Sequence, residues 1–246
     1  MFLSAFTASQ DDRSKFGPEP LPRVAVSGAS DKMPCPAIRC QSFVRGDLNE
    51  TLTAEGIWDV LTYNFVPFGN AYYPQSDCPG SKIYSRNQGV PCWQEKCGNS
   101  TAQPAECFEG EPLCQHGDDE CLGDRYEACA SVDALAGTVS ASQGAVFAYC
   151  LEAGPGGLDV AAADSCAAFA GIDPVALGAC AAAGSPSGDA ATAAAAKVTA
   201  EFTANYGRAW EGTPTVVLNG VVLLSTANLL AQVCAQAGGD APAGCS

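Results

Sequence analysis

The stretch Cys114-Gln115-His116-Gly117-Asp118-Asp119-Glu120-Cys121 is the most informative part of this chain. Cys129 follows it closely, so three cysteines lie within one short segment. Cysteines grouped in this way are typical of a disulfide framework. His116 is the only histidine of the chain, and we expect it to form structural hydrogen bonds rather than act as a general base.

The whole chain is rich in cysteine, with 14 among 246 residues. An even number spread along the sequence predicts disulfides formed in an oxidising compartment and disfavours a reduced cytosolic protein. A structural zinc site usually needs cysteine pairs separated by two residues, and no such pair occurs here. We therefore expect no metal site.

Charge and hydropathy narrow the partners and the compartment. The net charge of -15 and the pI of about 4.2 disfavour nucleic acid, because phosphate binding needs lysine and arginine. Two acceptor triplets, at Asn49 and Asn99, predict N-glycosylation. No apolar run is long enough to span a bilayer, and the first residues are too short for a signal-peptide core. Residues 1–21 are polar and read as a loose leader.

The pattern after the leader predicts a βαβ unit. Residues 23–27 form a strand candidate, a helix is expected from near Cys40 to Leu61, and residues 63–68 alternate like a second strand. A right-handed crossover would make the two strands parallel. The expected core of the helix is Phe43, Val44, Leu48, Leu52, Ile57 and Leu61.

The C-terminal part predicts a β-hairpin followed by a helix. Residues 213–218 form a strand candidate, Asn219-Gly220 is a type I′ turn signal, and residues 221–224 form the return strand. A final helix is expected from Thr226 to about Gln236.

The middle of the chain divides into two regions. Residues 72–113 predict a loop pinned by disulfides, in which Cys78, Cys92, Cys97 and Cys107 pair among themselves in a connectivity left open. Residues 124–206 are rich in alanine and predict helices. Asp173-Pro174 should begin one helix, which stops at Gly184, and Asp189 should cap another that runs to Tyr206. The expected apolar face consists of Val175, Leu177, Val198 and Phe202.

The segment around Cys114 resembles the signature of the gamma-interferon-inducible lysosomal thiol reductase (GILT) family, which reads CQHG, two residues, EC, two residues, Asn, four residues, Cys. Asp124 stands where that pattern has Asn. Residues 66–71 and 215–220 and the downstream cysteines also resemble the family in order. The signature positions, which we expect to be structural, are Cys114, Gln115, His116, Gly117, Glu120, Cys121, Asp124 and Cys129. Asp in place of Asn should remove a hydrogen-bond donor, and it could alter a local turn.

The resemblance implies an α/β fold with a thioredoxin-like core over residues 22–246. A large disulfide-rich, mostly helical insertion, about residues 72–206, would separate the βαβ unit from the C-terminal hairpin and helix. By the same resemblance Pro214 is a cis proline that shapes the substrate groove.

The resemblance also implies thiol chemistry, with Cys35 as the nucleophile and Cys40 as the resolving thiol. A helix N-terminus lowers the pKa of a nearby cysteine, and a small thiol rather than an organic cofactor would supply electrons. The family spaces its pair by two residues, whereas four separate Cys35 from Cys40. Five helical residues rise about 7.5 Å, beyond the Cα separation of about 4.4–6.8 Å that a disulfide needs. A helix starting at Pro36 would forbid the bridge, and one starting near Arg39 would permit it.

Three functions remain in competition. The first is a thiol reductase that acts on disulfide-bonded proteins in the secretory pathway, in a lysosome or vacuole, or outside the cell. The second is an inactive binding or scaffold protein of the same fold, with Cys35–Cys40 as a structural bridge. The third is an oxidase or isomerase, because the direction of exchange depends on a reduction potential that the sequence does not give. The sequence indicates neither the substrate nor the oligomeric state.

Overall fold

A computed structural model describes residues 23–27, 41–69, 71–78, 89–98, 103–115, 117–131, 134–135, 137–154, 159–206 and 214–245. The expected leader, the candidate pair Cys35 and Cys40, the acceptor Asn99 and the signature residue His116 all lie outside these ranges.

A four-stranded sheet in the order β2-β1-β3-β4 organises the described part of the chain. β1 (Arg23–Ser27) pairs in parallel with β2 (Thr62–Val66) and antiparallel with β3 (Thr215–Leu218), and β3 pairs antiparallel with β4 (Val221–Val222). The parallel pair confirms the predicted βαβ unit. Asn219 and Gly220 both have positive φ, 50° and 82°, as the predicted type I′ turn requires.

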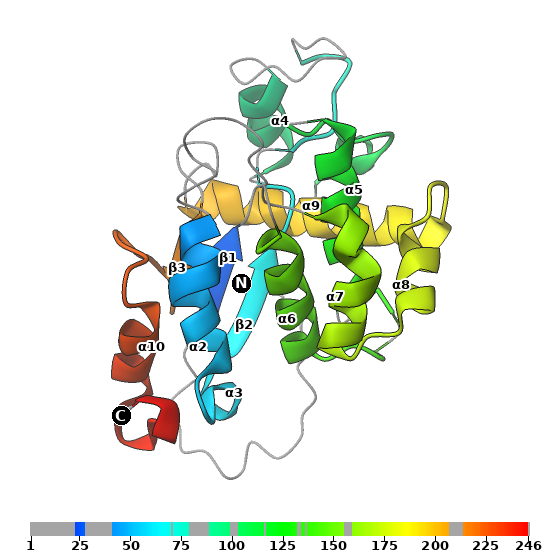
Figure 1. The fold of residues 1–246 in the computed structure, drawn as a ribbon. Coiled ribbons are helices and arrows are strands. Elements are labelled where there is room, and N and C mark those ends of the chain that lie inside the picture. The colour runs from blue at the N-terminus through cyan, green and yellow to red at the C-terminus, as the bar shows by residue number, and fades with distance from the viewer. Residues whose placement is uncertain are drawn as a thin grey trace.

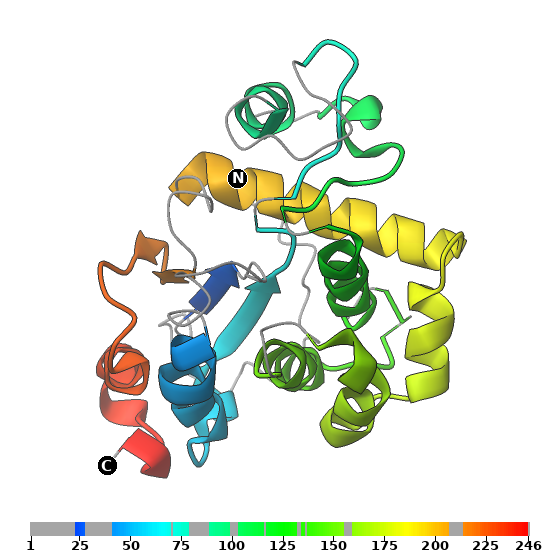
Figure 2. The same cartoon turned by 45° about the horizontal axis from the view of Figure 1, so that its top comes forward.

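Helices cover both faces of this sheet (Figure 1). On one face Val216 and Leu218 of β3 pack with Leu48 and Leu52 of the first helical segment and with Leu229 of the last helix. On the other face Val66 and Val217 pack against Phe202 of the long helix α9 (Pro186–Tyr206). Figure 2 shows α9 running across the end of the sheet, away from the first and last helices.

The first helix is broken rather than continuous to Leu61. A π-helical turn, η2 (Val44–Leu48), leads into α2 (Asn49–Thr53), and α3 (Ile57–Val60) follows a break. Gly56 makes the break with φ of 73°, and a Cβ on it would lie 2.9 Å from the side chain of Pro242. The predicted core of this segment is nevertheless confirmed, because all six expected side chains are buried.

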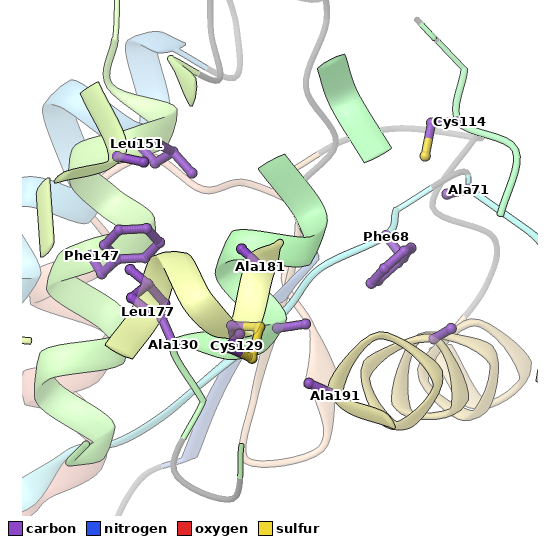
Figure 3. Packing of buried hydrophobic residues seen from close by; sticks show 14 of the residues in the cluster. Phe68, Ala71, Cys114, Cys129, Ala130, Phe147, Leu151, Leu177, Ala181 and Ala191 are labelled. Atoms are coloured by element: carbon purple, nitrogen blue, oxygen red, sulfur yellow. A yellow bond between two sulfur atoms is a disulfide. The ribbon is translucent and has the colours of Figure 1, made fainter. Parts of the chain in front are cut away.

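Between β2 and β3 the chain forms a second, mostly helical region. Its elements pack around one apolar cluster, in which Figure 3 shows Phe147, Leu151 and Leu177 gathered among the helices. The elements are α4 (Gly89–Cys97), η3 (Ala105–Phe108), α5 (Asp118–Cys129), α6 (Ala141–Glu152), η4 (Val160–Ala162), α7 (Ala163–Ala170), α8 (Pro174–Ala181) and α9. The region predicted as an irregular loop thus contains α4 and η3.

Several boundaries in the helical region differ from the sequence prediction. Asp173 caps α8 through the amide of Val175, as predicted, but α8 ends at Ala181, before Gly184. α9 begins at Pro186, where Ser185 Oγ accepts from the amide of Gly188. Asp189 is therefore inside the helix and not its cap.

The predicted apolar face was half right. Leu177 and Phe202 are buried, whereas Val175 is 80% and Val198 37% exposed. Alanines occupy the closely packed interfaces between these helices, and the two valines lie outside those interfaces. Ala167, Ala196 and Ala200 are each at most 2% exposed.

The C-terminal elements are shorter than predicted. β4 covers only Val221–Val222, and Leu224 beyond it is fully exposed. α10 (Leu229–Ala237) begins three residues later than expected, after Asn228 in a left-handed conformation. Two short 3-10 turns, η6 (Gly238–Asp240) and η7 (Ala243–Cys245), follow. β2 likewise ends at Val66, because Pro67 has no amide hydrogen to continue the ladder.

Candidate active site at the end of the sheet

Three chain segments meet at one end of the sheet, where β1 and β2 end and β3 begins. Ser27, the last residue of β1, pairs with Val66, the last residue of β2, and with Thr215, the first residue of β3. Pro214 immediately precedes Thr215, so it lies at this end of the sheet, and it is half-buried. The segment that contains Cys35 and Cys40 follows Ser27 in the sequence.

The described chain resumes at Gln41, directly after Cys40, and is helical there. Phe43 and Val44 anchor this helical segment in the core beside Tyr63 of β2 and Val216 of β3. β1 therefore precedes the segment containing the two cysteines, and a helical segment with buried side chains follows it.

Two side chains of that helix also tie it to α6. Arg45 donates from Nε and Nη2 to the carbonyl of Ala153, at 2.8 and 2.6 Å, and from Nη2 to that of Gly154 at 2.9 Å. Gln41 Nε2 donates to the same carbonyl of Gly154 at 3.1 Å. These carbonyls follow the last turn of α6, where backbone acceptors lack helical partners and positive charge is favoured.

Disulfides join all twelve cysteines that lie in the described ranges. The pairs are Cys78–Cys92, Cys97–Cys107, Cys114–Cys121, Cys129–Cys180, Cys150–Cys166 and Cys234–Cys245. The first two pairs confirm that the four cysteines between residues 78 and 107 bridge among themselves. Of the 14 cysteines in the sequence, only Cys35 and Cys40 are not members of these six pairs. Within one chain, each of these two has only the other as a remaining partner.

The three signature cysteines all take part in disulfides of the helical region. The Cys114–Cys121 disulfide pins the residues before α5 to the first turn of that helix, and Cys129–Cys180 joins the end of α5 to α8. Gly117, with φ of 96°, makes the entry into α5. Residues other than glycine rarely adopt this backbone conformation.

Asp124 lies in the middle of α5 and not itself in a turn. It is 3% exposed, and its carboxyl group accepts a hydrogen bond from the backbone amide of Phe68. Phe68 follows β2 in the turn Pro67–Gly69 and has a φ of 73° although it is buried. Thr199 of α9 holds the same turn, because its hydroxyl donates to the carbonyl of Pro67.

Burial and like charge perturb the acids around this turn. Burial, followed by the carboxyl groups of Glu120 and Glu152, raises the pKa of Asp124 well above its ordinary value. The pKa of Glu127 is raised in the same way, by burial and then by Glu152 and Asp124. Burial also raises the pKa of the Tyr63 hydroxyl on β2, with Glu127 and Glu152 adding to it.

Asn49, the acceptor of one predicted N-glycosylation triplet, belongs to another part of the chain. Asn49 begins α2 and is half-buried, while Thr51 of its acceptor triplet is buried, its hydroxyl donating to the carbonyl of Asp47.

In the described ranges, no group of His, Cys, Asp and Glu is arranged to hold a metal ion. No helix within those ranges is both long and apolar enough to cross a membrane.

Sequence reasoning missed two features of the site. The first is the tie from Gln41 and Arg45 to α6, which has no local sequence signal. The second is the face of buried acids on α5. Glu120, Asp124 and Glu127 are spaced four and three residues apart, which places them on one helical face. That spacing was visible in the sequence.

Comparison with known proteins supports the resemblance read from the signature. Residues 71–169 match the family model described as gamma interferon inducible lysosomal thiol reductase (GILT). The match covers the signature and the first helices after β2 and begins after the segment that contains Cys35 and Cys40. A search of curated proteins gave no match.

Proposed function

Starting from the GILT family segment that the chain carries at residues 71–169, we propose that this protein is a thiol–disulfide oxidoreductase that reduces protein disulfides. Cys35 is the nucleophile and Cys40 the resolving thiol. The observation that carries the proposal is the pairing of the other twelve cysteines, which leaves these two for exchange chemistry.

The strand arrangement supports a thioredoxin-like core. β1 and β2 are parallel, β3 is antiparallel to β1, β4 forms a hairpin with β3, and α10 follows. On this reading residues 22–246 form one domain, and the helical region between β2 and β3 is its insertion. The segment with Cys35 and Cys40 then leaves the carboxyl end of the first strand, where open sheets with parallel strands commonly place their ligands.

The reaction follows from two exchange steps. The Cys35 thiolate attacks one sulfur of a substrate disulfide, forming a mixed disulfide and releasing the first substrate thiolate. The Cys40 thiolate then attacks the Cys35 sulfur, which releases the second substrate thiolate and leaves a Cys35–Cys40 disulfide. Two molecules of a small thiol return this disulfide to dithiol and are themselves oxidised to a disulfide. The exchange requires no organic cofactor and no metal.

Pro214 and the helix after Cys40 have supporting roles. Pro214 lies at the edge where β1 ends, so it would border the groove that receives the substrate. Gln41 and Arg45 hold the helix after Cys40 against α6. The six disulfides suit a lysosomal, vacuolar or extracellular protein, and the net charge of -15 is compatible with an acidic compartment.

A trapping experiment tests the assignment of roles. The Cys40→Ser variant should form a covalent adduct with a disulfide-bonded protein such as insulin, because the mixed disulfide on Cys35 then has no resolving thiol. The adduct should survive denaturing electrophoresis and disappear on reduction. Cys35→Ser should form no such adduct. An adduct on Cys35→Ser and none on Cys40→Ser would reverse the two roles, and adducts of equal yield on both variants would contradict a fixed assignment.

An inactive scaffold is the second candidate, and the four-residue spacing between Cys35 and Cys40 favours it. In that case the two cysteines form a seventh structural bridge. Absence of any adduct with either variant, from a protein with all six other disulfides intact, would support the scaffold.

A further inference from the structure

The return strand of the C-terminal hairpin exposes apolar side chains. Val221 is 65%, Val222 36% and Leu224 104% exposed. β4 is the last strand in the sheet order, so no other strand of the described chain covers its outer side. Single exposed apolar side chains are ordinary, but a group of them beside a functional site indicates an interaction surface. We call these three side chains the apolar edge.

The register of the hairpin places Leu224 at the end of the sheet where the candidate active site lies. The amide of Leu223 donates to the carbonyl of Val216 at 2.8 Å. Because β3 and β4 are antiparallel, the next residue, Leu224, lies toward the start of β3, where Thr215 pairs with Ser27. Leu224 is therefore the member of the apolar edge nearest the segment that contains the two candidate thiols.

Hydrogen bonds hold the backbone on both sides of Leu224. The bond between β4 and β3 precedes it. After it, Gln232 of α10 donates from Nε2 to the carbonyl of Ser225 at 3.3 Å, and the amide of Asn228 donates to Asp47 Oδ1 of η2 at 2.6 Å. Because this backbone is already held, a partner that contacts Leu224 would lose little affinity to ordering of the loop.

This part of the chain carries no charge, although the chain as a whole is acidic. No Asp, Glu, Lys, Arg or His occurs in residues 212–239, whereas the whole sequence has 27 acidic and 12 basic residues. A charged occupant would find no opposite charge in these residues, and its contact with the apolar edge would remove water from the charge. An apolar occupant gains from the same loss of water. The composition therefore favours an apolar, uncharged segment as the partner.

We propose that Leu224 is a specificity-determining residue, which contacts an apolar side chain of an extended substrate segment while the disulfide of that substrate reacts at Cys35. The inference rests on the proposed function and names the substrates that the site favours. These are proteins in which apolar residues flank the reacting cysteine in an accessible, extended segment.

Strand spacing sets the distance between the apolar residue and the substrate cysteine. β3 separates β1 from β4 in the sheet. Neighbouring strands lie about 4.8 Å apart, so β4 is about 10 Å from β1, and an extended chain advances about 3.3 Å per residue. A substrate that crosses this end of the sheet would pass Pro214 and bring a side chain about three residues from its cysteine to Leu224.

Reduction of peptide disulfides tests the inference. The substrates are disulfide-linked dimers of a peptide rich in serine and threonine, with a leucine on each side of its cysteine at increasing spacing. The reference dimer has serine in place of leucine. The wild type should prefer the leucine peptides, and the ratio of kcat/KM values should be highest at a spacing of about three residues. That ratio should reach about tenfold, equivalent to about 1.4 kcal/mol, because the contact buries only part of each leucine.

Variants of Leu224 locate the preference. Leu224→Ser should abolish it and Leu224→Met should retain most of it, and neither should disturb folding because the side chain is fully exposed. Val175→Ser, which removes another exposed apolar side chain on α8, should leave the ratio unchanged. The inference would be overturned if Leu224→Ser kept the wild-type ratio, or if Val175→Ser lost it to the same extent.

Hydroxyethyl disulfide, which has no flanking residues, separates this inference from the proposed function. Reduction of this compound and of the peptides without a leucine preference would overturn the role of Leu224 and leave the thiol chemistry standing. Failure to reduce any of these disulfides would overturn the proposed function and the inference with it. Light scattering examines a second copy of the chain as the occupant. A wild-type dimer that dissociates in Leu224→Ser would assign the apolar edge to self-association and overturn the inference.

Discussion

Removing the Cys129–Cys180 disulfide should destabilise the protein more than removing any other of the six. This disulfide closes a loop with a sequence separation of 51, whereas Cys114–Cys121 closes one of 7. In the chain-entropy model the longer loop contributes about 4 kcal/mol and the shorter one about 2.5 kcal/mol. Cys129 and Cys180 are also at most 2% exposed, so replacing both with alanine adds a small packing loss in the same direction.

Urea unfolding of the paired alanine variants, followed by circular dichroism without reductant, measures the two losses. Cys129→Ala/Cys180→Ala should lose about 4 kcal/mol of unfolding free energy and Cys114→Ala/Cys121→Ala about 2.5 kcal/mol. The Cys35→Ser/Cys40→Ser variant serves as a reference for thiol removal at the candidate site. A loss for the long loop that is no greater than that for the short one would show that loop length does not set the order.

Three further outcomes are expected. Arg45→Ala should lower the unfolding free energy because it removes hydrogen bonds to the end of α6, and the loss should be only about 1 kcal/mol because those bonds are exposed to solvent. Lys96→Ala, which removes an exposed ion pair to Asp77, is the control, and an Arg45→Ala loss no larger than the control's would contradict this prediction. Thr199→Val should lower the free energy of urea unfolding by about 1–3 kcal/mol, since it removes the hydrogen bond that Thr199 donates to the buried carbonyl of Pro67. An unchanged urea midpoint would count against that hydrogen bond. Mild reduction with alkylation and peptide mapping should label Cys35 and Cys40 first and the fully buried pair Cys97–Cys107 last; early labelling of Cys97 would argue against this order.

Local chemistry explains which parts of the fold the sequence could predict. The Asn219-Gly220 turn and the Asp173-Pro174 helix start depend on the conformations of adjacent residues, and both are confirmed. Phe43, Val44, Leu48 and Leu52 could be assigned to the core because their spacing fits one broad helical face. Ile57 and Leu61, which follow the break at Gly56, are four residues apart and share a face of their own.

The parts that could not be predicted depend on contacts between distant segments. Gly56, at the break, lies so close to Pro242, far along the chain, that a Cβ would not fit between them. Alanines pack so closely between the helices after β2 that Val175 and Val198 are left outside, a result that hydrophobic spacing alone does not give. The environment of Asp124 requires the turn after β2 and the Cys114–Cys121 disulfide together, so the Asn-to-Asp difference could be noticed but not interpreted.

The candidate active site was predicted from the resemblance, and the structure constrains it through the surrounding residues. The pairing of Ser27 with Val66 and Thr215 brings together the segments that should frame the site. The six disulfides then account for every other cysteine in the sequence. The assignment of Cys35 and Cys40 remains a prediction about chemistry.

Insulin-disulfide reduction by the purified protein, with a small thiol donor at acidic and neutral pH, is the decisive test of that assignment. We expect a rate above that of the donor alone and its loss in both Cys35→Ser and Cys40→Ser, with folding unchanged. A folded wild-type protein with no activity at either pH, or activity retained without these cysteines, would contradict the proposed function.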